Sequence, residues 1–312
     1  MQTESISLDI PYIKLKFCAE LLEDTAMPSS KVSALRGGMG EMILRQNCVC
    51  DRACETCMFH KSCIVMHTMY SYMGKKPSYV TGKESVGYLI ECEDYSEEYE
   101  KGDILEFNLI LFGESIAYFN IYLQAFHNLG MQGIGKNHSR FMIREICNEA
   151  KEPILRENTV NMERYRIHTV DDYVRRRREK LAGGERYRIV FTTPLCMKYQ
   201  KEYLERFDSA AILQGILRRV QMLNYYTGHE AEFPEITEYP RVVSQRAVRG
   251  GIKRYSSTHD SKMSLRGITG NMTLEEVSEE CLDYLIAGEL LHLGKNTSFG
   301  FGKYQVYRVI GD

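Results

Sequence analysis

The sequence predicts an α+β protein built from two tandem ferredoxin-like (RRM-like, βαββαβ) domains, with a cysteine-rich insertion in the first. Three observations lead to this fold class. A short glycine motif occurs twice, about half the chain apart. Each copy lies between a segment with helical periodicity and a segment typical of a strand. The remainder of each half then fits the same strand–helix–strand–strand order, and a repeated unit of this kind indicates duplicated structure.

The repeated motif has the pattern Gly-apolar-Gly-Lys. Its copies are Gly133-Ile134-Gly135-Lys136 and Gly300-Phe301-Gly302-Lys303. The strand-like segments 141–143 and 304–307 follow the two copies. From this match we expect Gly135 and Gly302 to occupy equivalent positions in the two domains.

The other elements follow from hydrophobic periodicity and turn residues. An apolar residue occurs at every second position from 105 to 111, as expected of a half-buried strand: Leu105, Phe107, Leu109 and Leu111. In the first half we predict strands at 12–22, 86–91, 105–111 and 141–143 and helices at 34–46 and 116–126. In the second half we predict strands at 187–193, 239–248, 265–270 and 304–307 and helices at 212–223 and 282–290. The predicted domains are 1–150, with the cysteine-rich insertion at 48–63, and 185–312, joined by a connection at 151–184.

Composition places the chain among ordinary soluble proteins. Hydrophobic residues make up 44% and charged residues 26% of it, which is typical of a folded globular chain. The N-terminus lacks the pattern of a signal peptide, and no apolar run is long enough to span a membrane. Ten cysteines without a secretion signal indicate a reducing compartment. We therefore predict a cytoplasmic protein with no membrane partner.

Positive charge is concentrated in one segment. The formal net charge is −2, which does not indicate a strongly basic nucleic-acid-binding protein. Residues 241–270, however, contain seven Lys or Arg and one acidic residue, Asp260. Such a segment is either a solvated surface or a surface that binds phosphates.

The loop at 294–303 is the second candidate for phosphate binding. Its three glycines allow another backbone to come close, and their amides could face phosphate oxygens. Lys295, Lys303, Thr297 and Ser298 would add charge and hydroxyl donors. The loop leads into a strand, whereas a Walker loop leads into a helix. The alternative is a glycine-rich turn that only packs a helix against the sheet.

Several short segments, together with this loop, resemble the repeat-associated (RAMP) superfamily of CRISPR proteins. The similarity is strongest over 241–309 and favours the precursor-RNA processing endoribonucleases of that superfamily. The segments that carry it are Arg254-Tyr255-Ser256-Ser257, Gly267-Ile268-Thr269-Gly270, Leu290-Leu291-His292-Leu293-Gly294, Thr193-Pro194-Leu195 and Leu35-Arg36-Gly37-Gly38.

The resemblance implies that the protein binds precursor CRISPR repeat RNA and cleaves it without a metal ion, and that the processed guide RNA and other CRISPR effector subunits are partners. The 2′-hydroxyl attacks the adjacent phosphate and leaves a 2′,3′-cyclic phosphate and a 5′-hydroxyl. This chemistry needs a general base, positive charge at the phosphorane, and an acid or polar group at the leaving oxygen. Many relatives use a histidine on or just after the first helix. The corresponding segment here, 35–46, has none.

His259 is therefore the predicted base, because it lies in the basic segment near Ser256 and Tyr255. Tyr255 and His292 are the other catalytic candidates, although Tyr255 could instead stack on a base. The predicted RNA-binding residues are Arg249, Lys253, Arg254, Ser256, Lys295, Thr297, Ser298, Gly300, Gly302, Lys303, Gly133, Gly135 and Lys136.

Two other functions would fit parts of the sequence. A non-catalytic RAMP-type subunit of a CRISPR effector complex would keep the loops and the basic segment but would need no base. A metabolic ferredoxin-like protein would carry a nucleotide or cofactor fingerprint, and the sequence has none.

Five of the cysteines fall within sixteen residues, in an arrangement that could hold a structural zinc ion. The predicted ligands are Cys54, Cys57, Cys63 and one of Cys48 and Cys50, with Cys48 as the first choice. His60 or His67 could replace one thiolate. The alternatives are free thiols or a redox pair formed by Cys54 and Cys57.

Overall fold

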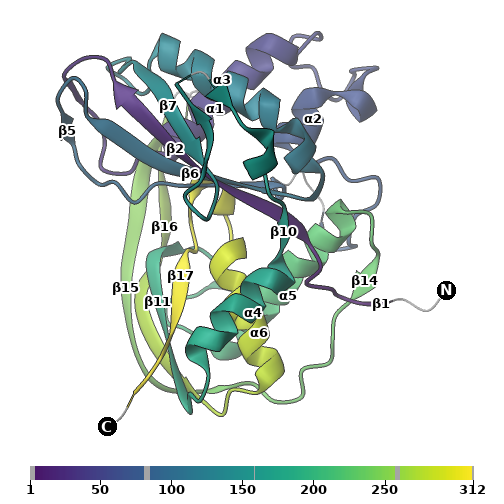
Figure 1. The fold of residues 1–312 in the computed structure, drawn as a ribbon. Helices are drawn as coiled ribbons and strands as arrows, with labels where there is room; N and C mark the ends of the chain where they lie inside the picture. The colour runs from purple at the N-terminus through teal and green to yellow at the C-terminus, as the bar shows by residue number, and fades with distance from the viewer. Residues whose placement is uncertain (1–3, 81–84, 158, 257–260, 311–312) are drawn as a thin grey trace. The chain divides into compact units, whose positions relative to one another are not determined.

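The computed structural model describes residues 4–80, 85–157, 159–256 and 261–310 (Figure 1). Its internal contacts divide the chain into two compact units. The N-terminal unit contains 11–168 and 226–228, and the C-terminal unit contains 1–10, 169–225 and 229–312. The division therefore falls at different residues from the predicted boundaries at 150 and 184, because the first ten residues and the end of the predicted connection pack with the C-terminal unit.

The N-terminal unit has the strand–helix–strand–strand–helix–strand order of a ferredoxin-like fold. Its main sheet has the order β4-β6-β2-β7 before continuing into β8 and β9, and the pairs within it are antiparallel. Its elements are β2 (Pro11–Leu21), β3 (Thr25–Ala26), α1 (Val32–Asn47), η1 (His60–Ser62), α2 (Ile64–Met69), β4 (Tyr88–Glu91), β5 (Glu98–Tyr99), β6 (Ile104–Phe112), η2 (Gly113–Tyr118), α3 (Phe119–Gln132), β7 (Phe141–Cys147), β8 (Pro153–Arg156), β9 (Thr159–Val160), η3 (Met162–Arg164) and β10 (His168–Thr169).

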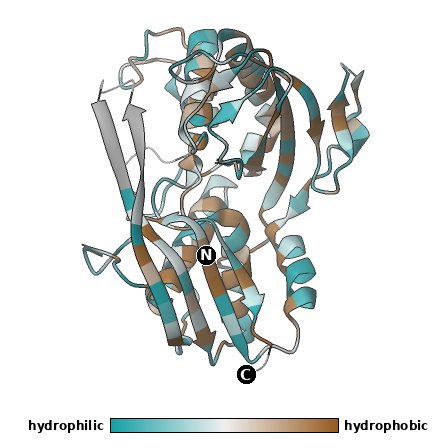
Figure 2. Ribbon diagram, turned by 90° about the vertical axis from the view of Figure 1, so that its left-hand side faces the viewer, coloured by the Kyte–Doolittle hydropathy of each residue, from teal (hydrophilic) through white to brown (hydrophobic). Residues whose placement is uncertain are grey.

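The core of this unit follows from alternation along β2 and β6. Leu15 and Phe17 of β2 and Leu105 and Phe107 of β6 are buried in one cluster with the apolar sides of α1 and α3. Figure 2 shows the alternation as bands of brown and teal along the strands. Helices α1 and α3 can pack closely because residue 38 is a glycine. A Cβ at this position would lie 2.4 Å from Leu129 Cδ1.

The C-terminal unit repeats the same topology. Its four-stranded antiparallel sheet has the order β15-β16-β11-β17, which corresponds strand for strand to β4-β6-β2-β7. The prediction of two ferredoxin-like domains is therefore confirmed. The elements are β1 (Glu4–Ser5), α4 (Val170–Leu181), β11 (Arg186–Leu195), β12 (Lys198–Tyr199), β13 (Glu202–Tyr203), α5 (Ser209–Tyr226), β14 (Ala231–Glu232), β15 (Arg241–Ser256), β16 (Ser261–Glu275), α6 (Glu279–Leu291), η4 (Thr297–Phe299) and β17 (Tyr304–Arg308).

The β15–β16 hairpin is longer than the sequence pattern predicted. Strand β16 pairs with β11 only from Ile268 to Glu275, whereas its pairing with β15 extends to Ser256 and Ser261. The outer part of the hairpin is thus a two-stranded ribbon. It lacks a third strand to pack beside, so its sequence does not show the hydrophobic alternation on which the prediction relied.

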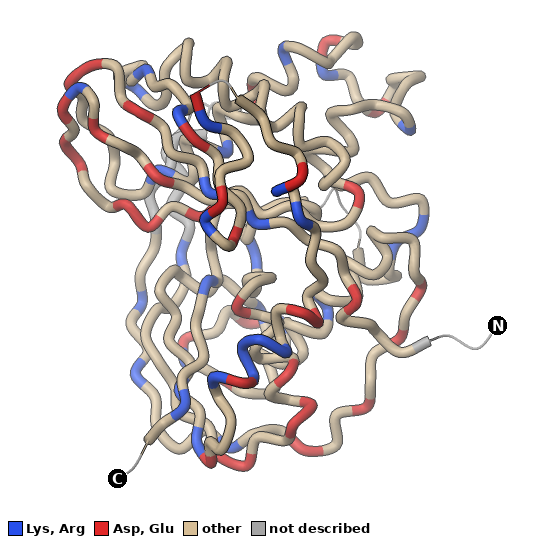
Figure 3. The backbone as a smooth tube through the Cα atoms, in the orientation of Figure 1, with Lys and Arg blue, Asp and Glu red and all other residues tan. Residues whose placement is uncertain are grey.

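The segment predicted as a connection contains regular structure. Strand β8 extends the N-terminal sheet beside β7, and α4 packs on α6 in the C-terminal unit. Helix α4 begins with a capping box in which Thr169 and Asp172 satisfy each other's backbone amides. Figure 3 shows the run of basic residues along this helix. In the described parts of the chain, no helix has both the length and the apolar character needed to cross a membrane.

A buried ion pair joins α4 to α6. Arg177 Nε donates to Glu289 Oε2 at 2.7 Å, and Arg177 Nη2 donates to Oε1 at 2.8 Å. The Tyr173 hydroxyl and the Val306 amide also donate to the Glu289 carboxylate, at 2.9 and 2.5 Å. The Glu289 side chain is 3% exposed, so these donors replace the water that a carboxylate would otherwise require.

We predict that Arg177→Met lowers the free energy of unfolding by about 3–5 kcal/mol, because it leaves the Glu289 charge buried without its counter-ion. Urea unfolding measures the change. Arg175→Met is the matched control on the same helix, since Arg175 pairs at the surface with Asp171 at 3.1 Å and its loss should cost about 0–1 kcal/mol. Equal effects of the two substitutions would contradict the role assigned to Arg177.

Candidate nucleic-acid interface

A cavity of about 490 Å³ lies in the C-terminal unit beside the α6–β17 loop. It is lined by three basic residues from three elements or loops: Arg249 of β15, Arg266 of β16 and Lys295 of the α6–β17 loop. Tyr203, at the end of β13, and Glu205 lie on the same cavity. The three cations are exposed, so they are free to meet a ligand from solvent.

Backbone hydrogen bonds to the end of β11 and the residue after it fix the position of Lys295. Its amide donates to the carbonyl of Cys196 at 2.7 Å, and the Gly302 amide donates to Pro194 at 3.0 Å. The Lys295 ammonium then lies 5.7 Å from the centre of the Tyr203 ring. The ring thereby has a cation nearby and is itself 55% exposed, which suits it to stacking against a base.

Arg249 also forms an ion pair with Glu205 at the cavity. Both side chains are largely exposed, so the pair is weak and a phosphate could compete with Glu205 for the guanidinium. Burial raises the pKa of the Cys196 thiol, which lies on the same cavity and therefore remains protonated near neutral pH.

Other parts of the glycine loop point inward. Thr297, Ser298, Gly300 and Gly302 are buried. The amides of Phe299, Gly300 and Gly302 donate to other carbonyls of the chain, so they are not directed at a phosphate. RNA binding by Thr297, Ser298, Gly300 and Gly302 stays a prediction, and their burial does not favour it. The alternative of a packing turn describes them.

The glycines are needed here for close backbone contact. Gly302 has φ +70°, and a Cβ on it would lie 1.8 Å from the carbonyl oxygen of Leu293. A Cβ on Gly294, with φ +84°, would lie 2.6 Å from the oxygen of Cys196. Lys303 is half-buried, and its backbone amide donates to the Thr193 hydroxyl at 2.8 Å.

The predicted catalytic residues are placed differently from one another. His292 caps α6 with φ +55° and is 0% exposed, so its ring lies inside the domain and cannot meet a phosphate in this conformation. This burial favours a structural role for His292 over the predicted catalytic one. His259 lies outside the described residues. For Tyr255, Lys253, Arg254 and Ser256 the structure describes the backbone alone, in the outer part of β15.

A smaller cavity, of about 220 Å³, lies beside the corresponding loop of the N-terminal unit. Gly135, Lys136 and Asn137 line it and are exposed. Gly133, in contrast, is the buried C-cap of α3, where a Cβ would lie 2.0 Å from the His138 carbonyl oxygen. Gly135 and Lys136 are therefore accessible to RNA, as their predicted role requires, whereas Gly133 is buried and is not accessible.

The two loops match in a register other than the predicted one. Gly135 follows Ile134, whose amide donates to Ser139 across the base of the loop. Gly294 follows Leu293, whose amide donates to Gly302 in the same way. Both glycines have left-handed backbones, with φ +72° and +84°. Gly135 is therefore equivalent to Gly294, and the predicted match of Gly135 to Gly302 is incorrect.

This register reveals a signal in the sequence that the Gly-apolar-Gly-Lys match concealed. Gly135-Lys136-Asn137 and Gly294-Lys295-Asn296 are identical tripeptides. Lysine and asparagine of both tripeptides line the two cavities. Tyr203 had no comparable signal, because it reaches its cavity only through the β12–β13 hairpin.

Two ferredoxin-like sheets, each followed by a helix–strand loop with an exposed lysine, place the protein in the class of duplicated ferredoxin-like proteins. Family models support this class. A model named AF_1859_N and described as an N-terminal domain matches 10–170, and the model for CRISPR-associated endoribonuclease Cas6 matches 189–304. The match over 189–304 supports a CRISPR Cas6-type RNA-processing family for this part of the chain. No curated protein is similar enough to add to these findings.

Solved structures share the fold at low sequence identity. A partial Cas6-RT-Cas1–Cas2 complex has a TM-score of 0.59 and 14% identity over 99% of this chain. The match spans 48% of that chain, so this protein covers about half the length of that relative. A Cas6 (TTHA0078) product complex has a TM-score of 0.52 at 12% identity, and the match covers 95% of this chain and 99% of the other. A Cas6 (TTHB231) product complex has a TM-score of 0.50 at 14% sequence identity, and the match covers 96% of this chain and 100% of the other.

The two loops provide a test of which glycines are structural. Gly302→Ala should lower the free energy of unfolding more than Gly135→Ala, because only the first would drive a Cβ into a carbonyl oxygen. Gly135→Ala meets open space and should cost about 1–2 kcal/mol for its left-handed backbone. Denaturant unfolding of the two variants measures the difference. A larger loss for Gly135→Ala would refute the packing described for Gly302.

Proposed function

We propose that the protein binds precursor CRISPR repeat RNA and cleaves it by attack of a 2′-hydroxyl on the adjacent phosphate, without a catalytic metal ion. The products would be a 2′,3′-cyclic phosphate and a 5′-hydroxyl, and the processed RNA would serve as guide. The observation that carries this proposal is the cavity lined by Arg249, Arg266 and Lys295, within the region that matches the Cas6 endoribonuclease model.

The residues of the cavity suit the binding part of this reaction. Arg249 and Arg266 present planar guanidinium groups that can bind two phosphate oxygens at once, while Lys295 acts as a compact charge. Tyr203 offers an exposed ring on which a base can stack. Positive charge held at the phosphate also stabilises the phosphorane that forms during attack.

The proton transfers require groups beyond this set. We propose His259 as the general base at the 2′-hydroxyl, because the ordinary pKa of a histidine lies near neutral pH. Tyr255 would supply the polar hydrogen at the leaving 5′-oxygen. Tyr255 lies near the outer end of β15, opposite Lys262 of β16, whereas His259 lies outside the described residues. The pairing of Arg249 with Ile268 and of Gly251 with Arg266 leads from the cavity into this outer part of the hairpin.

A non-catalytic RNA-binding subunit of an effector complex is the second candidate. The absence of a histidine from α1 (Val32–Asn47) favours it. Incubation of the purified protein with labelled CRISPR repeat RNAs in EDTA separates the two candidates, because cleavage supports the first and binding without cleavage supports the second.

Effector subunits are proposed partners in either case. The likeness to part of a Cas6-RT-Cas1–Cas2 complex adds Cas1–Cas2 assemblies as another candidate, and we propose a cytoplasmic location.

Lys295→Ala and Arg266→Ala should each weaken RNA binding and reduce the slope of log affinity against log salt by about one, because each substitution removes one phosphate contact. Filter binding across a salt series measures both quantities. Lys180→Ala is the control, since Lys180 is an exposed cation on α4 that does not line the cavity. An equal loss of affinity and slope for Lys180→Ala would refute the assignment to the cavity.

His259→Ala should slow cleavage about 10²–10⁴-fold, the usual contribution of a positioned acid or base, while affinity for RNA stays within a small factor. Tyr255→Phe should also slow cleavage, because it removes the polar hydrogen at the leaving oxygen. Single-turnover rates at saturating enzyme isolate the chemical step. If both variants cleave at the wild-type rate, neither residue is catalytic, and Lys295 and His138 become the next candidates.

A further inference from the structure

The cysteine segment between α1 and α2 contains almost no hydrophobic core of its own. Val49, Met58 and Phe59 are 76%, 86% and 50% exposed, and the short η1 helix within the segment has no buried residue. Asp51 and Arg52 both have left-handed backbones, which are unfavourable for side chains other than glycine. A segment of this kind needs a crosslink to hold one conformation, and inside a reducing compartment a metal ion is the usual one.

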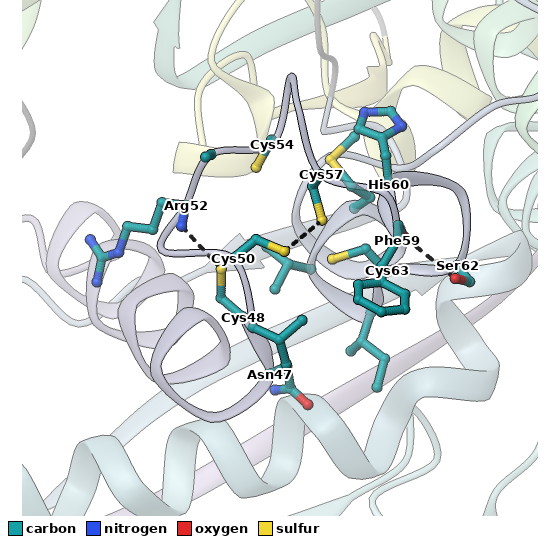
Figure 4. Close-up of a pocket in the computed structure, with 15 residues that line it drawn as sticks. Asn47, Cys48, Cys50, Arg52, Cys54, Cys57, Phe59, His60, Ser62 and Cys63 are labelled. Carbon is teal, nitrogen blue, oxygen red and sulfur yellow. Dashed lines mark hydrogen bonds between the residues drawn. The ribbon is translucent and has the colours of Figure 1, made fainter.

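All five thiols of the segment line one cavity, of about 300 Å³. Figure 4 shows Cys50 and Cys57 facing each other with Cys48 and Cys63 on either side, while Cys54 projects from another part of the loop. The sulfurs of Cys50 and Cys57 are 3.2 Å apart.

Thiols gathered this closely suit a divalent cation, because a metal ion binds the thiolate form of cysteine. The backbone also supports a thiolate at Cys48, because the Arg52 amide donates to Cys48 Sγ at 3.2 Å. Arg52 is held in place by an ion pair with Glu41 of α1 at 2.7 Å.

The histidines suggested as substitute ligands are used elsewhere. His67 places Nε2 2.8 Å from the Lys61 carbonyl oxygen and packs its ring against Tyr72 and Tyr118. The His60 ring packs edge-on against the Tyr72 ring, with 5.9 Å between the ring centres. Figure 4 shows the His60 ring turned away from the Cys50 and Cys57 sulfurs. An all-cysteine site therefore fits better than one with a histidine.

We propose that Cys48, Cys50, Cys57 and Cys63 form a tetrahedral thiolate site for zinc, with Cys50 in the place that the sequence had given to Cys54. Cys48 is the C-cap of α1 and Cys63 the N-cap of α2, so the ion would tie the loop to both helices. Zinc–sulfur bonds of about 2.3 Å place neighbouring sulfurs about 3.8 Å apart. In the described parts of the chain, no three His, Cys, Asp or Glu side chains are yet arranged around an ion, so binding draws the four thiols into this geometry.

Cys50→Ser and Cys54→Ser are a matched pair that tests the assignment. Protein purified under reducing conditions without added metal should contain about one zinc per chain by elemental analysis. Cys54→Ser should retain that zinc, whereas Cys50→Ser should lose most of it. Retention by Cys50→Ser with loss by Cys54→Ser would overturn the assignment.

A second measurement covers the case in which Cys50→Ser fails to fold. Cobalt(II) added to the metal-free wild-type protein should give the intense visible bands of a tetrahedral tetrathiolate site, and added zinc should abolish them. Absence of these bands, or a Cys50–Cys57 disulfide detected in the unreduced protein as the loss of two hydrogen atoms, would overturn the proposal. A chelator should also expose the loop at 49–62 to protease. None of these readouts depends on RNA cleavage, so they remain valid whether or not the proposed function holds.

Discussion

The candidate RNA site depends on one set of backbone hydrogen bonds, those that bind the α6–β17 loop to the end of β11 and the residue after it. The amides of Lys295 and Gly302 donate to Cys196 and Pro194, and the loop closes on itself where Leu293 donates to Gly302. Only glycine fits at Gly302 and Gly294, because a Cβ would meet a carbonyl oxygen. These contacts fix the path of the loop backbone, which places the Lys295 side chain beside Tyr203.

Different residues of the loop determine its backbone path and supply its charge. Buried glycines and hydroxyl residues determine the path of the backbone, whereas Lys295 supplies the charge that a phosphate would contact. The N-terminal loop has the same division in a shorter form, with Gly133 buried and Lys136 exposed. The match of 189–304 to the Cas6 endoribonuclease model agrees with this geometry, since a protein that processes RNA binds a polyanion.

Polar interactions within each unit support this scaffold. In the C-terminal unit, Arg177 and Glu289 hold α4 against α6, and Glu289 also fixes β17 through the Val306 amide. In the N-terminal unit, the cysteine segment lacks apolar contacts of comparable strength, and a metal crosslink would take their place. The buried charge pair thus holds α6, which carries the α6–β17 loop, whereas the proposed metal site would hold α1 and α2.

The sequence by itself determined the fold, because strand and helix order follow from local periodicity and both halves show the same order. It also singled out Arg249, Lys295 and Lys136 as candidates, and these residues line the two cavities beside the loops. Only the tertiary structure decided that His292, Thr297 and Ser298 are buried, that Gly135 matches Gly294, and that Cys50 lies with Cys57. The physical reason is that burial, loop register and the joining of Tyr203 to Lys295 arise from contacts between distant segments, which local patterns do not encode.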